Sequence, residues 1–389
     1  MWIQRNIEQT IRQLVDTRPA LLLTGVRQSG KTSLLKKLYP DAAYVTLDRV
    51  LTAQSAEENP GYFLKQFEKE AHVIIDEIQY APSLFRELKI RIDEDRNRFG
   101  RWILTGSQTF SLMENVSESL AGRIGVLHLE TLSAEELRNS GFFSDVNEIL
   151  WRGGYPEIWA HENILTEHFY DAYIQTYLER DLRQIIQVTN LRDFQRFIRA
   201  CAMRAGQLVN FSNLAKDVGV SANTIKSWLT VLEASGLIVL LQPYSANVKK
   251  RLVKAPKLYF SDQGILCRLL NIRSDDDLKG HILEGSIWEN FVFTEIKKHT
   301  GVSKDHLFFY RDQNNVEIDF LIEMKAHILL VEAKSSELVD PGKLNFNKVK
   351  SVLKERTSCI LACRTREPIP IGLKDYTVLN PIAMPIPAI

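Results

Sequence analysis

The sequence predicts an α/β protein in which a parallel-sheet domain is followed by a small helical module and a second α/β domain. Three observations lead to this prediction. A buried-strand pattern at 20–23 and a helical pattern at 33–38 flank a glycine-rich loop. A helix-turn-helix pattern lies at 211–232, and two strand patterns that carry acids lie at 315–322 and 327–334. The expected domain bounds are 1–150 for the first domain, 151–190 for a helical linker, 191–275 for the helical module and 276–389 for the last domain.

Length and composition are typical of a globular protein of several domains. The chain has 389 residues, 45% of them hydrophobic and 25% charged, with a formal net charge of +1. A near-neutral chain can contact nucleic acid only through a local patch. The four cysteines are scattered, which favours reduced core thiols over a metal site. The N-terminal residues lack the apolar segment of a signal peptide, and no apolar run has the length of a membrane span, so we expect a cytoplasmic protein without a membrane partner.

The glycine-rich loop has the composition and spacing of a phosphate-binding loop. Gly25, four residues, and then Gly30-Lys31-Thr32 match the motif whose backbone amides surround phosphates at a helix N-terminus. Lys31 can reach the β- and γ-phosphates of ATP, and Thr32 can hold Mg²⁺. The expected nucleotide contacts are Gly25, Gln28, Ser29, Gly30, Lys31 and Thr32.

A second apolar strand, 72–75, ends in two acids, Asp76 and Glu77. We expect Asp76 to lie in the outer shell of Mg²⁺ together with Thr32, and Glu77 to orient or deprotonate the attacking water. A further strand, 101–104, ends in polar residues, and Ser107 or Gln108 there is a candidate for sensing the γ-phosphate. An inserted strand between the two motifs, an acidic pair and a polar-ended next strand describe the AAA-type P-loop arrangement. This combination is absent from a simple nucleotide kinase or a GTPase.

Arg123 follows these motifs in the segment Leu120-Ala121-Gly122-Arg123. An arginine at this edge could reach the γ-phosphate of a neighbouring subunit as an arginine finger, which requires a homo-oligomer. The alternative is a surface arginine or a salt bridge to an acid such as Glu118.

The helical module is predicted to be a winged helix. Ser221 is a suitable N-cap for a helix that begins at Ala222 and turns Asn223, Thr224 and Lys226 outward as candidate DNA contacts. The segment that follows resembles a wing and carries five cations with no acid between Ser245 and Lys257. Phosphate contacts with double-stranded DNA and a solvated or protein-binding face are both consistent with it. The five cations are Lys249, Lys250, Arg251, Lys254 and Lys257.

The last domain carries acids in the order of a restriction-endonuclease-like site. Glu289 lies on an expected amphipathic helix, and Asp319 lies on the first of two strands. Glu332 and Lys334 lie on one face of the second strand because strand side chains alternate. Cleavage of a phosphodiester needs acids that hold Mg²⁺ and a lysine that orients water or stabilises charge. Alternating acids are also ordinary in half-exposed sheets, so the fold and the cleavage are separate predictions.

Taken in order, these motifs resemble those of a family of prokaryotic AAA-type ATPases with a C-terminal domain of unknown function. The resemblance covers almost the whole chain and includes Gly153-Gly154-Tyr155-Pro156 and the segment from Lys257 to Asp262. It implies ATP binding and hydrolysis, a winged-helix segment and a nuclease-like terminal fold. It leaves the biological role undefined.

Two functions follow from this architecture. In the first, a Mg²⁺-dependent ATPase couples hydrolysis to a DNA-associated C-terminal region that could act as a nuclease. In the second, nucleotide occupancy gates a surface that binds protein partners, and the nuclease-like domain is an inactive scaffold.

Overall fold

The computed structural model divides the chain into two compact units. One contains Trp2–Thr131 and the short segment Ala234–Gly236, and the other contains Met1, Leu132–Glu233 and Leu237–Ile389. The residues that the structure describes are 1–106, 119–142, 145–176, 191–244, 255–300, 304–325, 327–353, 356–366 and 375–386.

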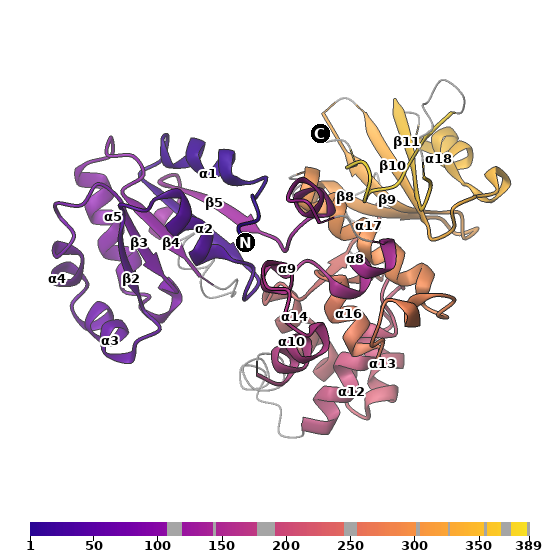
Figure 1. Cartoon of the computed structure of the whole chain (residues 1–389), viewed down its shortest axis with the longest axis horizontal. Coiled ribbons are helices and arrows are strands. Elements are labelled where there is room, and N and C mark those ends of the chain that lie inside the picture. Colours follow the sequence, from indigo (N-terminus) through magenta and orange to yellow (C-terminus); the bar gives the residue numbers. More distant parts are fainter. Residues whose placement is uncertain are drawn as a thin grey trace. The chain divides into compact units, whose positions relative to one another are not determined.

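The N-terminal unit is a parallel five-stranded sheet with helices on both faces (Figure 1). Its strand order is β2-β3-β4-β1-β5, so β4 lies between the strands that precede the two nucleotide motifs. All four pairings are parallel, so the C-terminal ends of β1 and β3 lie at the same end of the sheet. The strands are β1 (Ala20–Gly25), β2 (Ala43–Thr46), β3 (Val73–Asp76), β4 (Trp102–Thr105) and β5 (Ile124–Leu129).

Apolar side chains on the two faces of this sheet form separate cores. On one face, Leu21 and Leu23 pack with α1 (Glu8–Val15) and α2 (Lys31–Leu38). On the other face, Ala20 and Leu22 pack with the remaining helices. Strands buried on both faces account for the continuous apolar runs of the sequence. The helices of the second face are α3 (Val50–Glu58), α4 (Pro60–Lys65) and α5 (Leu84–Glu94), and a 3-10 turn, η1 (Ile78–Tyr80), follows β3.

The second unit begins before residue 150, the expected end of the first domain. The backbone amide of Ala134, at the start of α7, donates to the buried carboxylate of Glu295 at 3.0 Å. This contact lies within the second unit, which includes Leu132–Glu233. The first helices of the unit are α7 (Ala134–Asn139), α8 (Val146–Arg152), α9 (Pro156–Ala160) and α10 (Thr166–Tyr173).

A helical region with a two-stranded antiparallel sheet comes next. Two helices joined by a glycine turn lie where a helix-turn-helix is expected: α13 (Phe211–Val218) is followed by Gly219, which has a φ of 88°, and then by α14 (Ala222–Ala234). The Ser221 hydroxyl accepts from the Thr224 amide at 3.1 Å, as expected of an N-cap. The other elements are α12 (Leu191–Ala202), β6 (Ile238–Leu241), β7 (Lys257–Phe260), α16 (Gln263–Leu269) and η3 (Asp276–Leu278).

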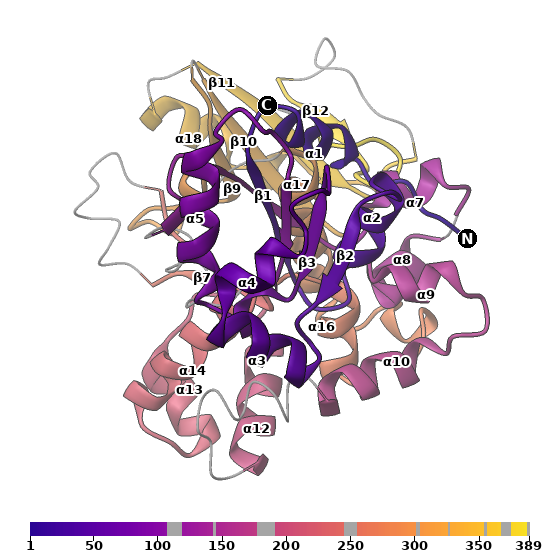
Figure 2. The same ribbon diagram turned by 90° about the vertical axis from the view of Figure 1, so that its left-hand side faces the viewer.

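The C-terminal part is a mixed five-stranded sheet of order β12-β11-β10-β9-β8. β10 pairs with β11 in parallel and with β9 in antiparallel fashion. The long helix α17 (Glu284–Thr300) lies against the sheet, where the Trp288 indole donates to the Ala362 carbonyl at 3.1 Å. α18 (Phe346–Leu353) packs through Phe346 and Val349, and Figure 2 shows this helix beside the strands of the sheet. The strands are β8 (Leu307–Arg311), β9 (Glu317–Glu323), β10 (Ile328–Lys334), β11 (Thr357–Cys363) and β12 (Thr377–Leu379), with the short turns η4 (Lys304–His306) and η5 (Pro341–Lys343).

No helix in the described ranges is both long enough and apolar enough to cross a membrane.

Candidate functional site

The expected phosphate-binding loop joins β1 to α2 at the C-terminal edge of the parallel sheet. Gly25 ends β1 with a φ of 150°, and a Cβ there would lie 2.3 Å from the Leu129 carbonyl oxygen. Gly30 precedes α2 with a φ of 92°. Both backbones need a residue without a Cβ, so the glycines of the motif are explained by the turn itself.

Lys31 and Ser29 have the polar groups that an anion in this loop would meet. The Lys31 ammonium is buried and donates to the carbonyls of Gly25 at 3.1 Å and Val26 at 3.0 Å. Burial lowers the pKa of Lys31, and the charges of Glu77 and Asp76 oppose this effect. The Ser29 hydroxyl is buried without a hydrogen-bond partner among the described residues. A buried ammonium that contacts carbonyl oxygens and a buried hydroxyl that has no partner among the described residues fit a loop that receives phosphate.

Three hydroxyl groups converge on the carboxylate of Asp76 at the end of β3. Thr32 donates to its two oxygens at 2.9 and 3.0 Å, and Tyr44 donates at 2.8 Å. Thr105, at the end of β4, donates to the same carboxylate. The contact between Thr32 and Asp76 brings together the two residues expected to hold Mg²⁺. Tyr44 and Thr105 were not predicted from the sequence.

Glu77 directly follows Asp76 and has a left-handed backbone, with a φ of 57° and a ψ of 49°. Its amide donates to the Thr105 hydroxyl at 3.2 Å, and its carboxylate accepts from the Gln79 side chain. A non-glycine residue in this conformation is uncommon, and such strain is found at functional positions. Burial and the charges of Glu77 and Asp76 raise the pKa of a further acid, Asp48.

Arg5 holds the phosphate-binding loop from outside the motif. Its guanidinium donates to the Ser29 carbonyl at 3.1 Å and to the Glu130 carbonyl at 2.7 Å, and the residue is buried. A single arginine near the N-terminus gives no pattern that sequence reasoning could have detected.

Arg123 forms a two-pronged ion pair with Asp93 of its own chain. The distances from Nε and Nη2 to the two carboxylate oxygens are 2.7 and 2.9 Å. The sequence is consistent with either an arginine finger or a salt bridge to an acid such as Glu118. Ser107, Gln108 and Glu118 lie outside the described residues.

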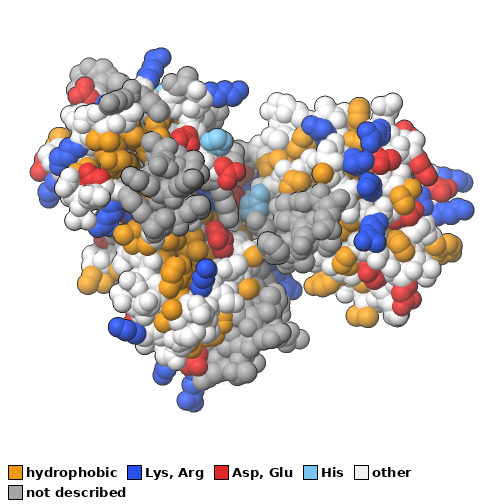
Figure 3. All heavy atoms as spheres, turned by 180° about the vertical axis from the view of Figure 1, so that it is seen from behind, with side chains coloured by type: hydrophobic (Ala, Val, Ile, Leu, Met, Phe, Trp, Pro, Cys, Tyr) orange, Lys and Arg blue, Asp and Glu red, His pale blue; other side chains and the backbone are white. Residues whose placement is uncertain are grey.

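The candidate DNA contacts of α14 lie on the side of the helix that does not pack. Asn223 and Lys226 are exposed and Thr224 is half-buried, whereas Ile225 and Leu229 are buried. Lys249, Lys250, Arg251 and Lys254 lie outside the described residues. On the face shown in Figure 3, Lys and Arg side chains are interspersed with Asp and Glu.

The four residues of the expected nuclease-like site are linked on one side of the C-terminal sheet. The Lys334 ammonium lies 2.9 Å from a Glu332 oxygen and 3.4 Å from an Asp319 oxygen. Asp319 also accepts from the Ala333 amide at 2.8 Å, and Glu332 accepts from the Asn345 amide at 2.9 Å. Glu289 reaches the cluster from α17, and burial together with the charge of Asp319 raises its pKa to about 7.

A fifth and a sixth member of this cluster, Lys257 and Glu317, were not predicted. Lys257 was expected on a basic wing, but it is buried, and its ammonium lies 2.6 Å from Glu317 and 3.0 Å from Glu289. Burial alone would lower the pKa of Lys257, but the neighbouring carboxylates outweigh burial and raise it. Glu317 stands two positions before Asp319 on β9, so strand alternation could have identified it.

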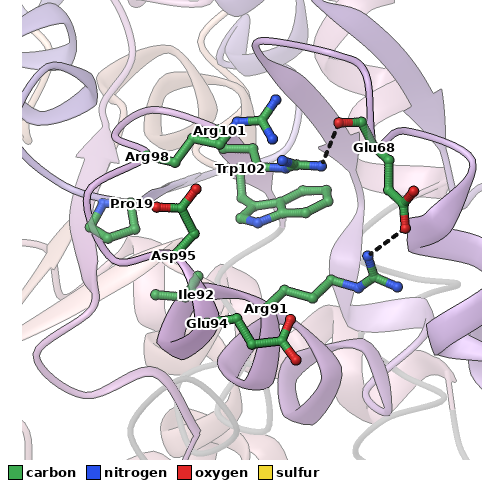
Figure 4. Close-up of a pocket in the computed structure, with 9 residues that line it drawn as sticks. All are labelled: Pro19, Glu68, Arg91, Ile92, Glu94, Asp95, Arg98, Arg101 and Trp102. Atoms are coloured by element: carbon green, nitrogen blue, oxygen red, sulfur yellow. Dashed lines mark hydrogen bonds and ion pairs between the residues drawn. The ribbon is translucent and has the colours of Figure 1, made fainter.

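A separate hollow of about 350 Å³ is lined by Pro19 and Trp102, among other residues (Figure 4). These two residues lie where β1 and β4 begin, whereas the phosphate-binding loop follows the end of β1. Arginines also line the hollow, but they hold backbone carbonyls: Arg91 that of Gly61 at 2.7 Å, and Arg98 that of Glu70 at 2.7 Å. These contacts give the arginines a structural role.

Comparisons with known proteins agree with this organisation. Residues 17–138 match the family described as AAA domain, 143–276 match the domain of unknown function DUF8612, and 284–388 match the domain of unknown function DUF4143. An uncharacterised protein of Mycobacterium tuberculosis is 30% identical over 324 residues, which cover 82% of this chain and 71% of the relative. The chain belongs to this family of AAA-domain proteins with a C-terminal domain of unknown function.

One more relative and one solved structure extend the comparison. An uncharacterised protein of Haemophilus influenzae is 22% identical over 360 residues, covering 85% of this chain and 86% of the relative. The Walker-type ATPase of Pyrococcus abyssi aligns with a TM-score of 0.46 and 17% identity, covering 69% of this chain and 96% of that chain. The match of residues 17–138 to the AAA domain family identifies an AAA-type ATPase domain in the N-terminal unit, as its sequence predicts. The relatives leave the function of the C-terminal part unknown.

Proposed function

We propose that the protein is a Mg²⁺-dependent ATPase whose nucleotide state controls a binding surface elsewhere in the chain. The observation that carries the first half is the contact of Thr32 with Asp76 beside the buried ammonium of Lys31. These are the groups that hold Mg²⁺ and phosphate in P-loop enzymes. Bound Mg²⁺ would neutralise charge on the phosphates during hydrolysis.

The residues of this chain have distinct roles in the proposed reaction. Lys31 and the loop amides bind the phosphates, and Asp76 orients Thr32. Glu77 accepts the proton of the attacking water. The Thr105 hydroxyl accepts a hydrogen bond from the Glu77 amide and so fixes the backbone of Glu77. Ser107 senses the γ-phosphate in this proposal.

Phosphate release from ATP tests this proposal. We expect turnover that requires Mg²⁺ in the wild type and disappears in Lys31→Ala. A matched control is Lys37→Ala, which removes an exposed lysine of the same helix and should leave turnover unchanged. Equal turnover in all three proteins would reject the assignment of the site.

The trans role of Arg123 remains part of the proposal and requires a homo-oligomer. Its present pairing with Asp93 would have to open for the guanidinium to reach a neighbouring γ-phosphate. Mixing Arg123→Ala with Glu77→Gln protein tests this directly, because each supplies the group that the other lacks. Recovery of turnover in the mixture supports a trans finger, and no recovery at any ratio rejects it.

For the controlled surface, the cluster geometry favours the protein-binding alternative over the nuclease. Glu289 and Asp319 lie 3.0 and 3.8 Å from the ammonium of Lys257, a cation that is not part of the expected nuclease-like site. The DNA-associated alternative rests on the exposed Asn223 and Lys226 of α14, with Lys249, Lys250 and Arg251 as further proposed contacts.

Binding of double-stranded DNA at several salt concentrations separates the two. DNA affinity must fall steeply as the salt concentration rises. Lys226→Ala should reduce the slope of log binding constant against log salt concentration by about one unit. Absence of DNA affinity at low salt, together with ATP turnover that is insensitive to DNA, would leave the protein-binding function.

A further inference from the structure

We infer that Lys257 is a built-in cation that closes the acidic cluster of the C-terminal sheet to divalent metal ions. Its ammonium takes the central place among three carboxylates: 2.6 Å from Glu317, 3.0 Å from Glu289 and 3.8 Å from Asp319. This inference does not depend on ATP hydrolysis, because every group involved belongs to the second unit.

The cluster is balanced by two ammonium groups that arrive from different strands. Lys257 begins β7, whereas Lys334 ends β10 and contacts Glu332 and Asp319. Asp319 therefore lies between two cations. The side chain of Lys257 is only 3% exposed, so water does little to weaken these contacts.

A divalent ion does not fit beside this ammonium. Mg²⁺ binds carboxylate oxygens at roughly 2.1 Å and requires near-octahedral oxygen ligands. An ion held by the oxygens that now contact Lys257 would be in direct contact with a positive charge. Consistent with this, no group of three or more acidic, His or Cys side chains in the described part of the chain has an arrangement that could hold a metal ion.

The fold fixes the backbone that carries Lys257. β7 pairs with β6, and on its other side the Leu258 amide donates to the Gln207 carbonyl at 3.1 Å while the Gly206 amide donates to the Leu258 carbonyl at 2.8 Å. Two residues along, the Tyr259 ring stacks on Phe293 at 4.4 Å.

Tyr259 reinforces the same contact. Its hydroxyl donates at 2.6 Å to the Glu289 oxygen that also accepts from Lys257. The segment from Lys257 to Tyr259 thus joins the helical region to α17 and β9 through ion pairs and a hydrogen bond. Its basic and aromatic residues are explained by this internal role and not by nucleic-acid contacts.

Binding of Mn²⁺, followed by electron paramagnetic resonance on the full chain without nucleotide, tests the inference. An Asp76→Asn background removes the contribution of the N-terminal site. In this background, with Lys257 present, we expect Asp319→Asn to leave the amount of bound Mn²⁺ unchanged. A stoichiometric Mn²⁺ that Asp319→Asn removes would overturn the inference.

Lys257→Met supplies the positive arm, because it removes the charge and keeps a long apolar side chain. We expect a gain of one Mn²⁺ per chain, bound at least tenfold more tightly than by the background and lost again with Asp319→Asn. Lys279→Met, which removes an exposed lysine paired with Asp276, is the control that should gain nothing. A folded Lys257→Met protein that gains no Mn²⁺ would also overturn the inference. If this variant does not fold, the effect of Asp319→Asn on Mn²⁺ binding in the protein that keeps Lys257 tests the inference.

Discussion

Replacing Asp262 by alanine should destabilise the second unit far more than the loss of an ordinary helix cap. Asp262 is 1% exposed and caps α16 by accepting from the Gly264 amide at 2.9 Å. The same oxygen accepts from the Tyr170 hydroxyl at 3.1 Å, and the other carboxylate oxygen accepts from the Gly154 amide at 2.8 Å. One carboxylate thus joins α16 to the turn before α9 and to α10.

The magnitude follows from these partners. Loss of the cap costs about 1 kcal/mol. The buried Gly154 amide is left without a partner, which costs a further ~1–3 kcal/mol. A total of about 3 kcal/mol lowers the melting temperature of a unit of this size by roughly 6–12 °C. Gly153 packs directly against this carboxylate in the wild type, since a Cβ there would lie 2.3 Å from Asp262 Oδ1.

Thermal unfolding followed by circular dichroism measures the effect, with Asn210→Ala as the matched control. Asn210 caps α13 by accepting from the Asn213 amide at 3.0 Å and is exposed, so its loss should cost about 1 kcal/mol. A shift for Asp262→Ala no larger than the shift for Asn210→Ala would refute the reasoning.

Three further substitutions have expected outcomes. Arg5→Met should weaken ATP binding about tenfold, since a charged hydrogen bond of ~1.5–3 kcal/mol to the phosphate-binding loop is lost; isothermal titration with a non-hydrolysable ATP analogue checks it, and unchanged affinity would contradict the role of Arg5. Tyr44→Phe should raise the Mg²⁺ concentration for half-maximal turnover about fivefold, because one hydrogen bond worth ~1 kcal/mol no longer orients Asp76; an unchanged Mg²⁺ dependence would count against it. Burial alone would lower the pKa of His299, but its contacts with Glu295 and Glu135 raise it, so its stabilisation is present below the unfolded-state pKa and lost as pH rises through the folded-state pKa. His299→Gln should therefore lower the melting temperature more at pH 5.5 than at pH 8.5, and an equal loss at both would be inconsistent with a charged His299.

Residues in local motifs could be predicted from the sequence. The loop from Gly25 to Thr32 has fixed spacing, and Asp76 follows a buried strand, so parallel-strand geometry brings both to one edge of the sheet. Ser221 could be predicted as a cap for the same reason: its partner lies three residues away. Local chemistry determines these positions.

Arg5 and Lys257, which act through long-range contacts outside any motif, could not be predicted. Arg5 meets the phosphate-binding loop 24 residues later, and Lys257 meets Glu289 32 residues later. In the sequence, Lys257 ends a run of cations and therefore indicates a solvated wing. Only the pairing of β7 within the fold shows that it is buried among acids.

The measurement that tests the central proposal most directly is single-turnover release of γ-phosphate from ATP by wild-type and Glu77→Gln protein, each present in excess over ATP. If Glu77 is the general base, Glu77→Gln should bind ATP with wild-type affinity and release phosphate more slowly by about 10²–10⁴-fold. Equal release rates in the two proteins, at equal occupancy, would contradict the account.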